Sequence, residues 1–185
     1  MKNAKVYKFI KPQDPLKEAV EIAEKLGIKG KVKKFENMNT YSIESDAGIF
    51  EYWYDTGKWQ YMSADAGDIT GGNVPNEEEC LKIAKEFMNS MGMDIPERFQ
   101  KIVFTEASSG DEFQGDYRII HRTVNFYPVI DGKEVYGVSR ITIRIGPFGK
   151  ILGIEKFYKD YIEDGIYETI DADTVLKLLE TDWGQ

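Results

Sequence analysis

The sequence predicts an α+β protein made of two tandem units, each a helix followed by an antiparallel sheet. Two amphipathic helical stretches, 15–26 and 77–91, align with each other at an offset of 61 residues. Each stretch is followed by short β-rich runs separated by tight turns, which is typical of antiparallel pairing. We therefore expect an N-terminal helix–meander unit, a second helix–meander unit, and a C-terminal helix with a tail, at residues 1–68, 76–170 and 171–185.

In the first unit, Asp14 is placed to cap a helix whose first position is Pro15. Apolar residues then recur at helical spacing until Gly27 ends the helix, at Leu16, Ala19, Val20, Ala23 and Leu26. Four strands in a meander are expected next, at 31–36, 40–45, 49–54 and 58–63. The basic segment before the helix contains Val6–Ile10, which we interpret as either a short strand or a tail.

The second unit begins with Asn76 and Glu79, which form the pattern of a helix N-cap and its capping box. The apolar stripe of this helix consists of Leu81, Ala84, Phe87, Met88 and Met91. A strand at 99–106 and a long exposed loop at 107–116 are expected to follow.

A three-stranded meander is predicted at 117–158. Asp131-Gly132 lies between alternating apolar residues, which is the strongest short-range hairpin signal. Pro and Gly within 146–150 supply the second turn. After the meander, 159–170 is interpreted as an acidic connector, and a third helix is expected at 174–180.

The hairpin also predicts a register, in which paired residue numbers sum to 263, so Tyr127 lies opposite Tyr136 and Thr123 opposite Arg140. One face should bury against the second helix, and it holds Ile120, Val124, Phe126, Ile141, Ile143 and Ile145. The other face holds His121, Thr123, Asn125, Tyr127, Tyr136, Arg140, Thr142 and Arg144. Arg118 and Arg122 would then fall on the apolar face, so either they lie at the sheet margin or the register is wrong.

Composition excludes some classes of partner. The formal net charge is −8 and the pI is about 4.9, so nucleic acid and anionic membrane surfaces are poor candidates. A single cysteine, Cys80, excludes an intramolecular disulfide, which is compatible with the cytosol and with disulfide-free exported proteins. The sequence has no apolar run long enough to span a membrane, and 1–13 lacks the apolar region of an intact signal peptide.

The hairpin and its surroundings resemble a known family. The segments Phe126–Gly137, Ile141–Ile143 and Gly149–Ile151 resemble PepSY-like domains and are similar to the related sheet of YycI/YycH-type extracytoplasmic regulators. Asp171–Leu176 resembles the helix start common in such domains, and the match covers roughly 76–179. The resemblance implies a cystatin-like helix on an antiparallel sheet, an extracytoplasmic or cell-surface setting, and a role in binding or restraining another protein. It brings no catalytic residues.

All arginines lie in the second half of this acidic chain, at Arg98, Arg118, Arg122, Arg140 and Arg144. Arginine suits bidentate recognition of carboxylates, so the polar sheet face is a candidate surface for a carboxylate-bearing ligand or an acidic partner segment. The alternative is an ordinary solvated face with cross-strand polar pairs. The candidate partner-binding residues are Arg140, Arg144, His121, Tyr127, Tyr136, Trp53 and Trp59.

The two tryptophans belong to an aromatic cluster that spans Tyr52 to Tyr61. Alternation along a strand should point Trp53 away from Tyr52 and Tyr54, which leaves aromatic surface outside the core. That surface is predicted to be either a partner groove or the place where the two units meet.

No catalytic or metal-binding pattern is present, so we expect neither a cofactor nor a metal. His121 has no partners at ligand spacing, and Cys80 aligns with Ala19 of the first helix, so both are expected to be structural. The leading hypothesis is a non-enzymatic binding or regulatory module that engages a protein or peptide. The first alternative is a small-molecule-binding protein or, less expected, an enzyme with a cleft between the two units. A pocket lined by Trp53, Trp59 and Arg140 would favour it. The second alternative is a structural piece of a larger exported protein. Open sheet edges would permit a homodimer by strand addition.

Overall fold

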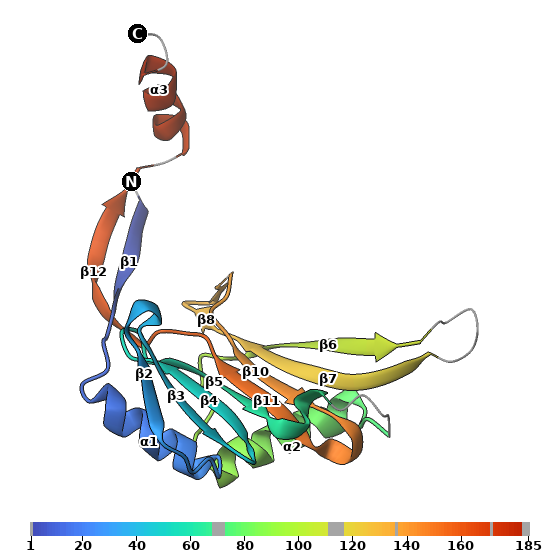
Figure 1. Cartoon of the computed structure of the whole chain (residues 1–185). Helices are drawn as coiled ribbons and strands as arrows, with labels where there is room; N and C mark the ends of the chain where they lie inside the picture. Colours follow the sequence, from blue (N-terminus) through green and yellow to red (C-terminus); the bar gives the residue numbers. More distant parts are fainter. Residues whose placement is uncertain (1, 68–72, 111–116, 136, 171, 183–185) are drawn as a thin grey trace. The chain divides into compact units, whose positions relative to one another are not determined.

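The computed structural model describes residues 2–67, 73–110, 117–135, 137–170 and 172–182 (Figure 1). The chain forms two compact units, which are described separately. The larger unit comprises residues 12–159, and the smaller unit combines the segment up to residue 11 with the segment from residue 160.

The larger unit is built on one antiparallel sheet, which confirms the predicted α+β fold with antiparallel pairing. The sheet has eight strands. From one edge to the other they are β2 (Val32–Phe35), β3 (Thr40–Ser45), β4 (Gly48–Trp53), β5 (Lys58–Ser63), β11 (Ile151–Lys156), β10 (Ile141–Ile145), β7 (Arg118–Tyr127) and β6 (Lys101–Ser109). The two groups of four strands join where β5 pairs with β11, with Trp59 opposite Lys156.

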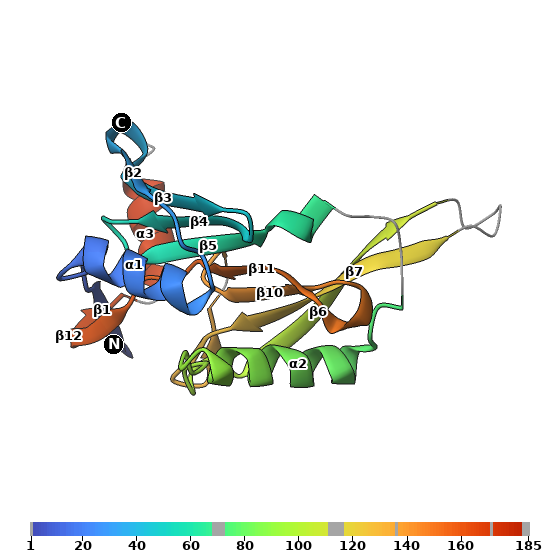
Figure 2. The same ribbon diagram turned by 60° about the horizontal axis from the view of Figure 1, so that its bottom comes forward.

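Two helices cover one face of this sheet (Figure 2). Helix α1 (Pro15–Lys25) packs against β3 and β4, and α2 (Glu77–Ser90) packs mainly over β7 and β10. The core lies between the helices and the sheet, and one row of its side chains crosses five adjacent strands at Phe50, Tyr61, Ile154, Ile143 and Val124.

The helices begin where their capping residues predict. The Asp14 carboxylate accepts a hydrogen bond of 3.2 Å from the Lys17 amide, and Asn76 with Glu79 forms a complete capping box. The helix positions that face the sheet are mostly small, which lets the helix backbones approach the strands closely. These buried residues are Ala19 and Ala23 in α1, and Cys80, Ala84 and Met88 in α2.

The Asp131-Gly132 turn forms, but it sets the register of only a short two-stranded pair and not of the whole predicted hairpin. Strands β8 (Val129–Ile130) and β9 (Lys133–Glu134) pair in the predicted register, with Ile130 opposite Lys133. In the main sheet, however, Arg144 lies opposite Thr123 and Ile141 opposite Phe126, so the paired numbers sum to 267. The prediction that Thr123 faces Arg140 was therefore wrong by four residues, and its pairing of Tyr127 with Tyr136 involves a residue outside the described ones.

The two faces of the hairpin were nevertheless predicted correctly. Side chains alternate with a period of two, so a shift of four residues leaves every side chain on its original face. Val124, Phe126 and the three isoleucines of β10 are buried against the helices, with exposed fractions of 2% or less. The extra residues lie in the segment after β9, outside the ladder.

The smaller unit contains β1 (Lys2–Phe9), β12 (Tyr161–Thr169) and α3 (Ala172–Asp182), and β1 and β12 pair antiparallel. The interpretation of 159–170 as a connector was wrong, since most of it is a strand. Its charged residues obscure the alternation, and they are matched by lysines on β1, as where Lys5 Nζ lies 3.2 Å from Glu163 Oε2. No helix in the described residues is both long and apolar enough to cross a membrane.

Candidate functional site

The face of the sheet opposite α1 and α2, called the open face here, carries a row of side chains across all eight strands that is polar on every strand except β6. The row consists of Lys33, Ser42, Glu51, Gln60, Glu155, Thr142, Asn125 and Val103. Neighbours in the row bond to one another: Gln60 donates to Glu51, and Thr142 Oγ1 lies 3.1 Å from Asn125 Oδ1. Much of the row's hydrogen-bonding capacity is therefore used within the sheet.

The predicted arginine site lies on this open face. Arg140 Nε donates to Thr142 Oγ1 at 3.1 Å, and Arg144 Nη2 lies 3.8 Å from Glu155 Oε1. Burial lowers the pKa of the His121 imidazole below its ordinary value, and the positive charge of Arg144 adds to this effect. The structure thus brings Arg140, Arg144 and His121 to one face. Arg140 is engaged by Thr142, two residues further along the chain, and Arg144 is engaged by Glu155 of the neighbouring strand β11.

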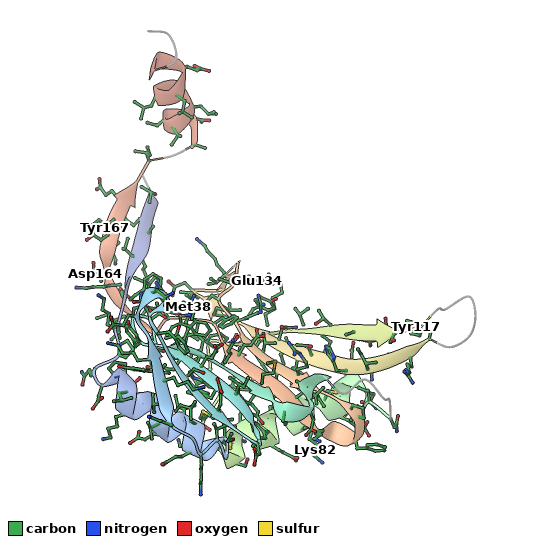
Figure 3. The ribbon with its side chains drawn as sticks, viewed as in Figure 1. Met38, Lys82, Tyr117, Glu134, Asp164 and Tyr167 are labelled. Carbon is green, nitrogen blue, oxygen red and sulfur yellow. The ribbon has the colours of Figure 1, made fainter. Side chains whose placement is uncertain are left out.

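The other predicted site residues are dispersed. Tyr127 is half-buried and lines a hollow of about 320 Å³ beside the β8–β9 hairpin. Glu134 of this hairpin also lines the hollow and is labelled in Figure 3. Tyr136 lies outside the described residues. Trp53 is on the open face with its ring 5.8 Å from that of Phe157, whereas Trp59 is 3% exposed in the core on the helix face.

Both tryptophans lie near the β5–β11 junction, on opposite faces of the sheet. The Trp53–Phe157 contact crosses this junction on the open face, and Trp59 is paired with Lys156 across it. The exposed aromatic surface predicted outside the core is therefore occupied in part by contact between the two groups of strands.

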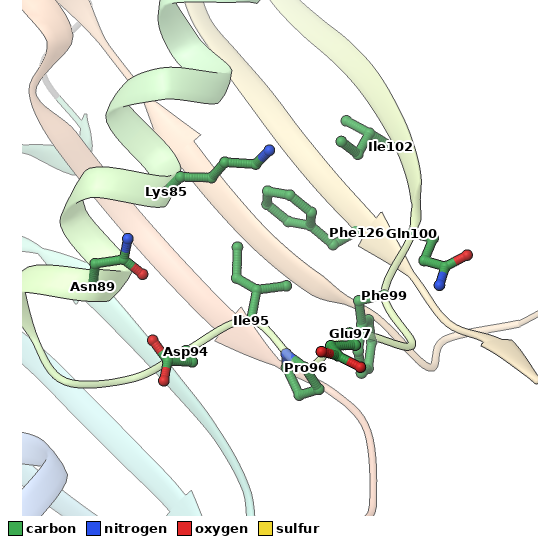
Figure 4. A pocket seen from close by; sticks show the side chains of 10 residues that line it. All are labelled: Lys85, Asn89, Asp94, Ile95, Pro96, Glu97, Phe99, Gln100, Ile102 and Phe126. Carbon is green, nitrogen blue, oxygen red and sulfur yellow. The ribbon is translucent and has the colours of Figure 1, made fainter.

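One concave site, a groove beside α2, was not predicted from the sequence (Figure 4). This α2–β6 groove has a volume of about 680 Å³ and lies between α2, the 93–100 loop and the edge of the sheet. It is lined by Lys85, Asn89, Asp94, Ile95, Pro96, Glu97, Phe99, Gln100, Ile102 and Phe126. No motif marks it, because its residues come from a helix, a loop and two strands.

The groove has an apolar floor and a polar rim. Phe126 and Phe99 are 1% and 4% exposed, and Ile102 is half-buried. Lys85 and Asn89 project from α2 at the rim (Figure 4). The groove exists because α2 packs mainly over β7 and β10, which leaves the helix-facing side chains of β6 incompletely covered.

The groove runs beside an edge strand. β6 is the last strand in the order of the sheet, so it has a strand neighbour on one side. The loop wall is held in place by the Phe99 ring, whose centroid lies 4.7 Å from that of Tyr158, and by the Val129 amide, which donates to the Arg98 carbonyl at 2.6 Å. A preformed groove beside an edge strand is a suitable place for an added strand.

A second cavity, of about 240 Å³, lies between α1 and α2 at the β5–β11 junction. It is lined by Ile22, Trp59, Met88, Met93, Asp94, Ile141, Lys156 and Tyr158. Lys156 Nζ lies 3.3 Å from the Gly57 carbonyl and 4.5 Å from the centre of the Tyr158 ring. Of the residues predicted for a cleft here, Trp59 lines the cavity, whereas Trp53 and Arg140 lie on the opposite face of the sheet.

Cys80 belongs to the core. It is fully buried in the first turns of α2, and its Sγ lies 3.3 Å from the Pro75 carbonyl. Burial raises the pKa of the Cys80 thiol, and nearby Arg122 partly opposes that rise. Among the described residues, no three acidic, histidine or cysteine side chains are grouped so that they could hold a metal ion.

Comparison with known proteins gave no match to any family model, to any curated protein or to any solved structure.

Proposed function

We propose that this protein is a non-enzymatic binding module that holds an extended segment of a protein or peptide partner in the α2–β6 groove. The observation that carries the proposal is the coincidence of an apolar-floored groove with the edge strand β6. An added strand would form main-chain hydrogen bonds with β6, and every second side chain would point toward α2.

The shape of the groove determines the chemistry of the segment. Side chains entering it meet Phe126, Phe99 and Ile102, so the partner needs apolar residues at alternate positions. The rim carries both Lys85 and Asp94, so charge at the flanks contributes orientation more than affinity. At about 680 Å³, the groove falls within the range of about 300–1,000 Å³ that is usual for binding pockets.

We further infer that the chain consists of tandem helix–meander units of the PepSY-like, cystatin-like kind. Helix α1 precedes β2–β5 and α2 precedes the strands β6, β7, β10 and β11, and the two groups meet through their last strands. The offset of 61 residues between the helices supports this inference. A role in restraining a regulatory partner, in an extracytoplasmic setting, would follow from that kinship.

Peptide selection tests the groove. Random peptides displayed on phage are selected on the immobilised chain, and the affinity of an enriched peptide is measured by fluorescence anisotropy. Asn89→Trp places a large side chain at the groove rim and should weaken binding at least tenfold, about 1.4 kcal/mol. Lys82→Trp is the matched control, because Lys82 is an exposed residue of α2 that does not line the groove. Equal binding to both variants, or no enriched peptide, would refute the proposal.

A second candidate function is favoured by the cavity between α1 and α2. Its walls combine Trp59, two methionines and Tyr158 with the ammonium group of Lys156 and the carboxylate of Asp94. This lining suits a small apolar molecule whose anionic group lies at Lys156. The probe is 8-anilinonaphthalene-1-sulfonate, followed by its fluorescence. Met93→Trp should abolish binding by filling the cavity, whereas Met91→Trp, at a half-buried position outside it, should not. Equal probe fluorescence in both variants would exclude this site.

A further inference from the structure

We propose that a second copy of this chain adds its β12 to the free edge of β1, so that copies associate through their smaller units. The pair formed by β1 and β12 is called the terminal ribbon here. This inference is independent of the α2–β6 groove.

The terminal ribbon and α3 expose much apolar surface for their size. Among the described residues, none of the buried hydrophobic residues of the core belongs to this unit. More than half of the exposed large apolar residues that the structure describes belong to it, namely Val6, Phe9, Ile10, Ile162, Ile166, Tyr167, Ile170, Val175, Leu176, Leu178 and Leu179. Apolar surface gathered in this way marks an interaction site.

Helix α3 shows the same feature. Every side chain from Ala172 to Glu180 is exposed, although the helix carries an apolar stripe in which Leu176 and Leu179 are 57% and 51% exposed. By contrast, α1 and α2 each bury several apolar residues against the large sheet. A second copy supplies apolar surface of the same kind, from its own ribbon and its own α3.

The ribbon has two strands, so each of its strands has a neighbour on one side. Isolated two-stranded sheets are marginally stable in water, and about three or more strands, or a helix packed on the sheet, are needed for independent stability. The side chains of α3 from Ala172 to Glu180 are exposed, so this helix does not supply that packing. Edge-to-edge addition of two ribbons produces four strands. Exchange of β1 between copies would leave two strands in each ribbon. Addition therefore supplies the further strands that a stable sheet needs, and exchange does not.

Charge selects which edges meet. β1 contains Lys2, Lys5 and Lys8 and no acidic residue, whereas β12 is acidic and contains no basic residue. Asp164 and Tyr167 project from β12 in Figure 3. Pairing β1 with β1, or β12 with β12, would oppose like charges, whereas β1 beside β12 of another copy opposes unlike charges. The contact is therefore heterologous, and each addition leaves a new pair of free edges.

The experiment is sedimentation velocity of the full chain over a wide range of concentration. The average mass should rise beyond that of a dimer, and high salt should weaken the association by screening the strand charges. Lys8→Glu should reduce the association constant at least tenfold, while circular dichroism shows that the larger unit is still folded; Lys5 is left unchanged because it pairs with Glu163 within the ribbon. A wild-type chain that remains monomeric, or a charge-reversed chain that associates equally well, would overturn the proposal.

A locked ribbon separates addition from exchange. Ala4 and Tyr167 lie opposite each other, so Ala4→Cys with Tyr167→Cys, in a Cys80→Ala background, can form a disulfide within the ribbon. The oxidised chain cannot exchange β1, yet its free edges remain. It should associate as the reduced chain does. Association of the reduced chain alone would show that copies exchange strands, which contradicts the proposal.

Discussion

The Tyr52 hydroxyl donates a hydrogen bond of 2.6 Å to the Glu18 carboxylate. It joins β4 to the first turn of α1 across 34 residues of sequence, and the Tyr52 side chain is 1% exposed. The contact holds the start of the helix against the sheet, at a position where α1 otherwise buries small alanine side chains.

Removal of this hydroxyl should destabilise the larger unit. We expect Tyr52→Phe to lower the free energy of unfolding by about 1–2 kcal/mol, because a hydrogen bond to a charged group is lost while Glu18 retains contact with water. Glu18→Gln keeps an acceptor oxygen and should cost less. Urea denaturation followed by circular dichroism measures both, and an equal or larger loss for Glu18→Gln would contradict the assignment.

Substitution of Arg122 should cost much more stability than substitution of Arg118, although the predicted register placed both on the apolar face. Arg122 Nε lies 2.9 Å from Glu106 Oε1, and its Nη1 donates to the carbonyls of Val74 and Pro75 just before α2. The Arg122 side chain is 15% exposed, so Arg122→Met should cost about 1–3 kcal/mol.

Arg118→Met is the matched control, because Arg118 is exposed near the start of β7. Its effect should stay within about 0.5 kcal/mol. Thermal unfolding of the two variants, measured in one buffer, checks the contrast. Comparable losses would mean that the contacts of Arg122 with the segment before α2 contribute little stability.

His121 should titrate below its ordinary range. Burial lowers its pKa in the folded chain, and Arg144 contributes further, so the folded protein takes up this proton less readily than the unfolded chain. Well above pH 6.5, His121 is neutral in both states and its lowered pKa does not affect stability. The free energy of unfolding decreases as the pH falls from about 6.5 through the lowered pKa. NMR titration of this single histidine measures the shift directly.

Arg144→Met should move the pKa of His121 part of the way back toward its ordinary value, since it removes the smaller of the two causes. Lys150→Met removes a positive charge from an exposed residue that does not contribute to the shift, and it should leave the titration unchanged. A His121 pKa at or above its ordinary value in the native chain would contradict the partly buried placement.

Cys80 should react slowly with Ellman's reagent. The thiol is fully buried and its pKa is raised, so both access and thiolate formation are suppressed. We expect the native reaction to follow the opening of α2 and to become fast in urea. Rapid native labelling would show that the first turns of this helix open far more easily than its capping box suggests.

The sequence by itself determined the features that depend on neighbouring residues. Helix starts follow from caps such as Asn76 with Glu79, and the burial of Val124 and Ile143 follows from alternation. Alternation survives a register error of four residues, which is why the faces of the hairpin were predicted correctly although the pairing of Thr123 was not.

The tertiary structure decided what depends on a distant partner. The acidic segment 161–169 is a strand because the lysine-rich β1 pairs with it, and β5 meets β11 through residues about a hundred positions apart. The α2–β6 groove exists because α2 packs mainly over β7 and β10 and leaves Ile102 partly uncovered. Local propensity carries no information about these placements, since each arises from the packing of segments that approach one another only in the folded chain.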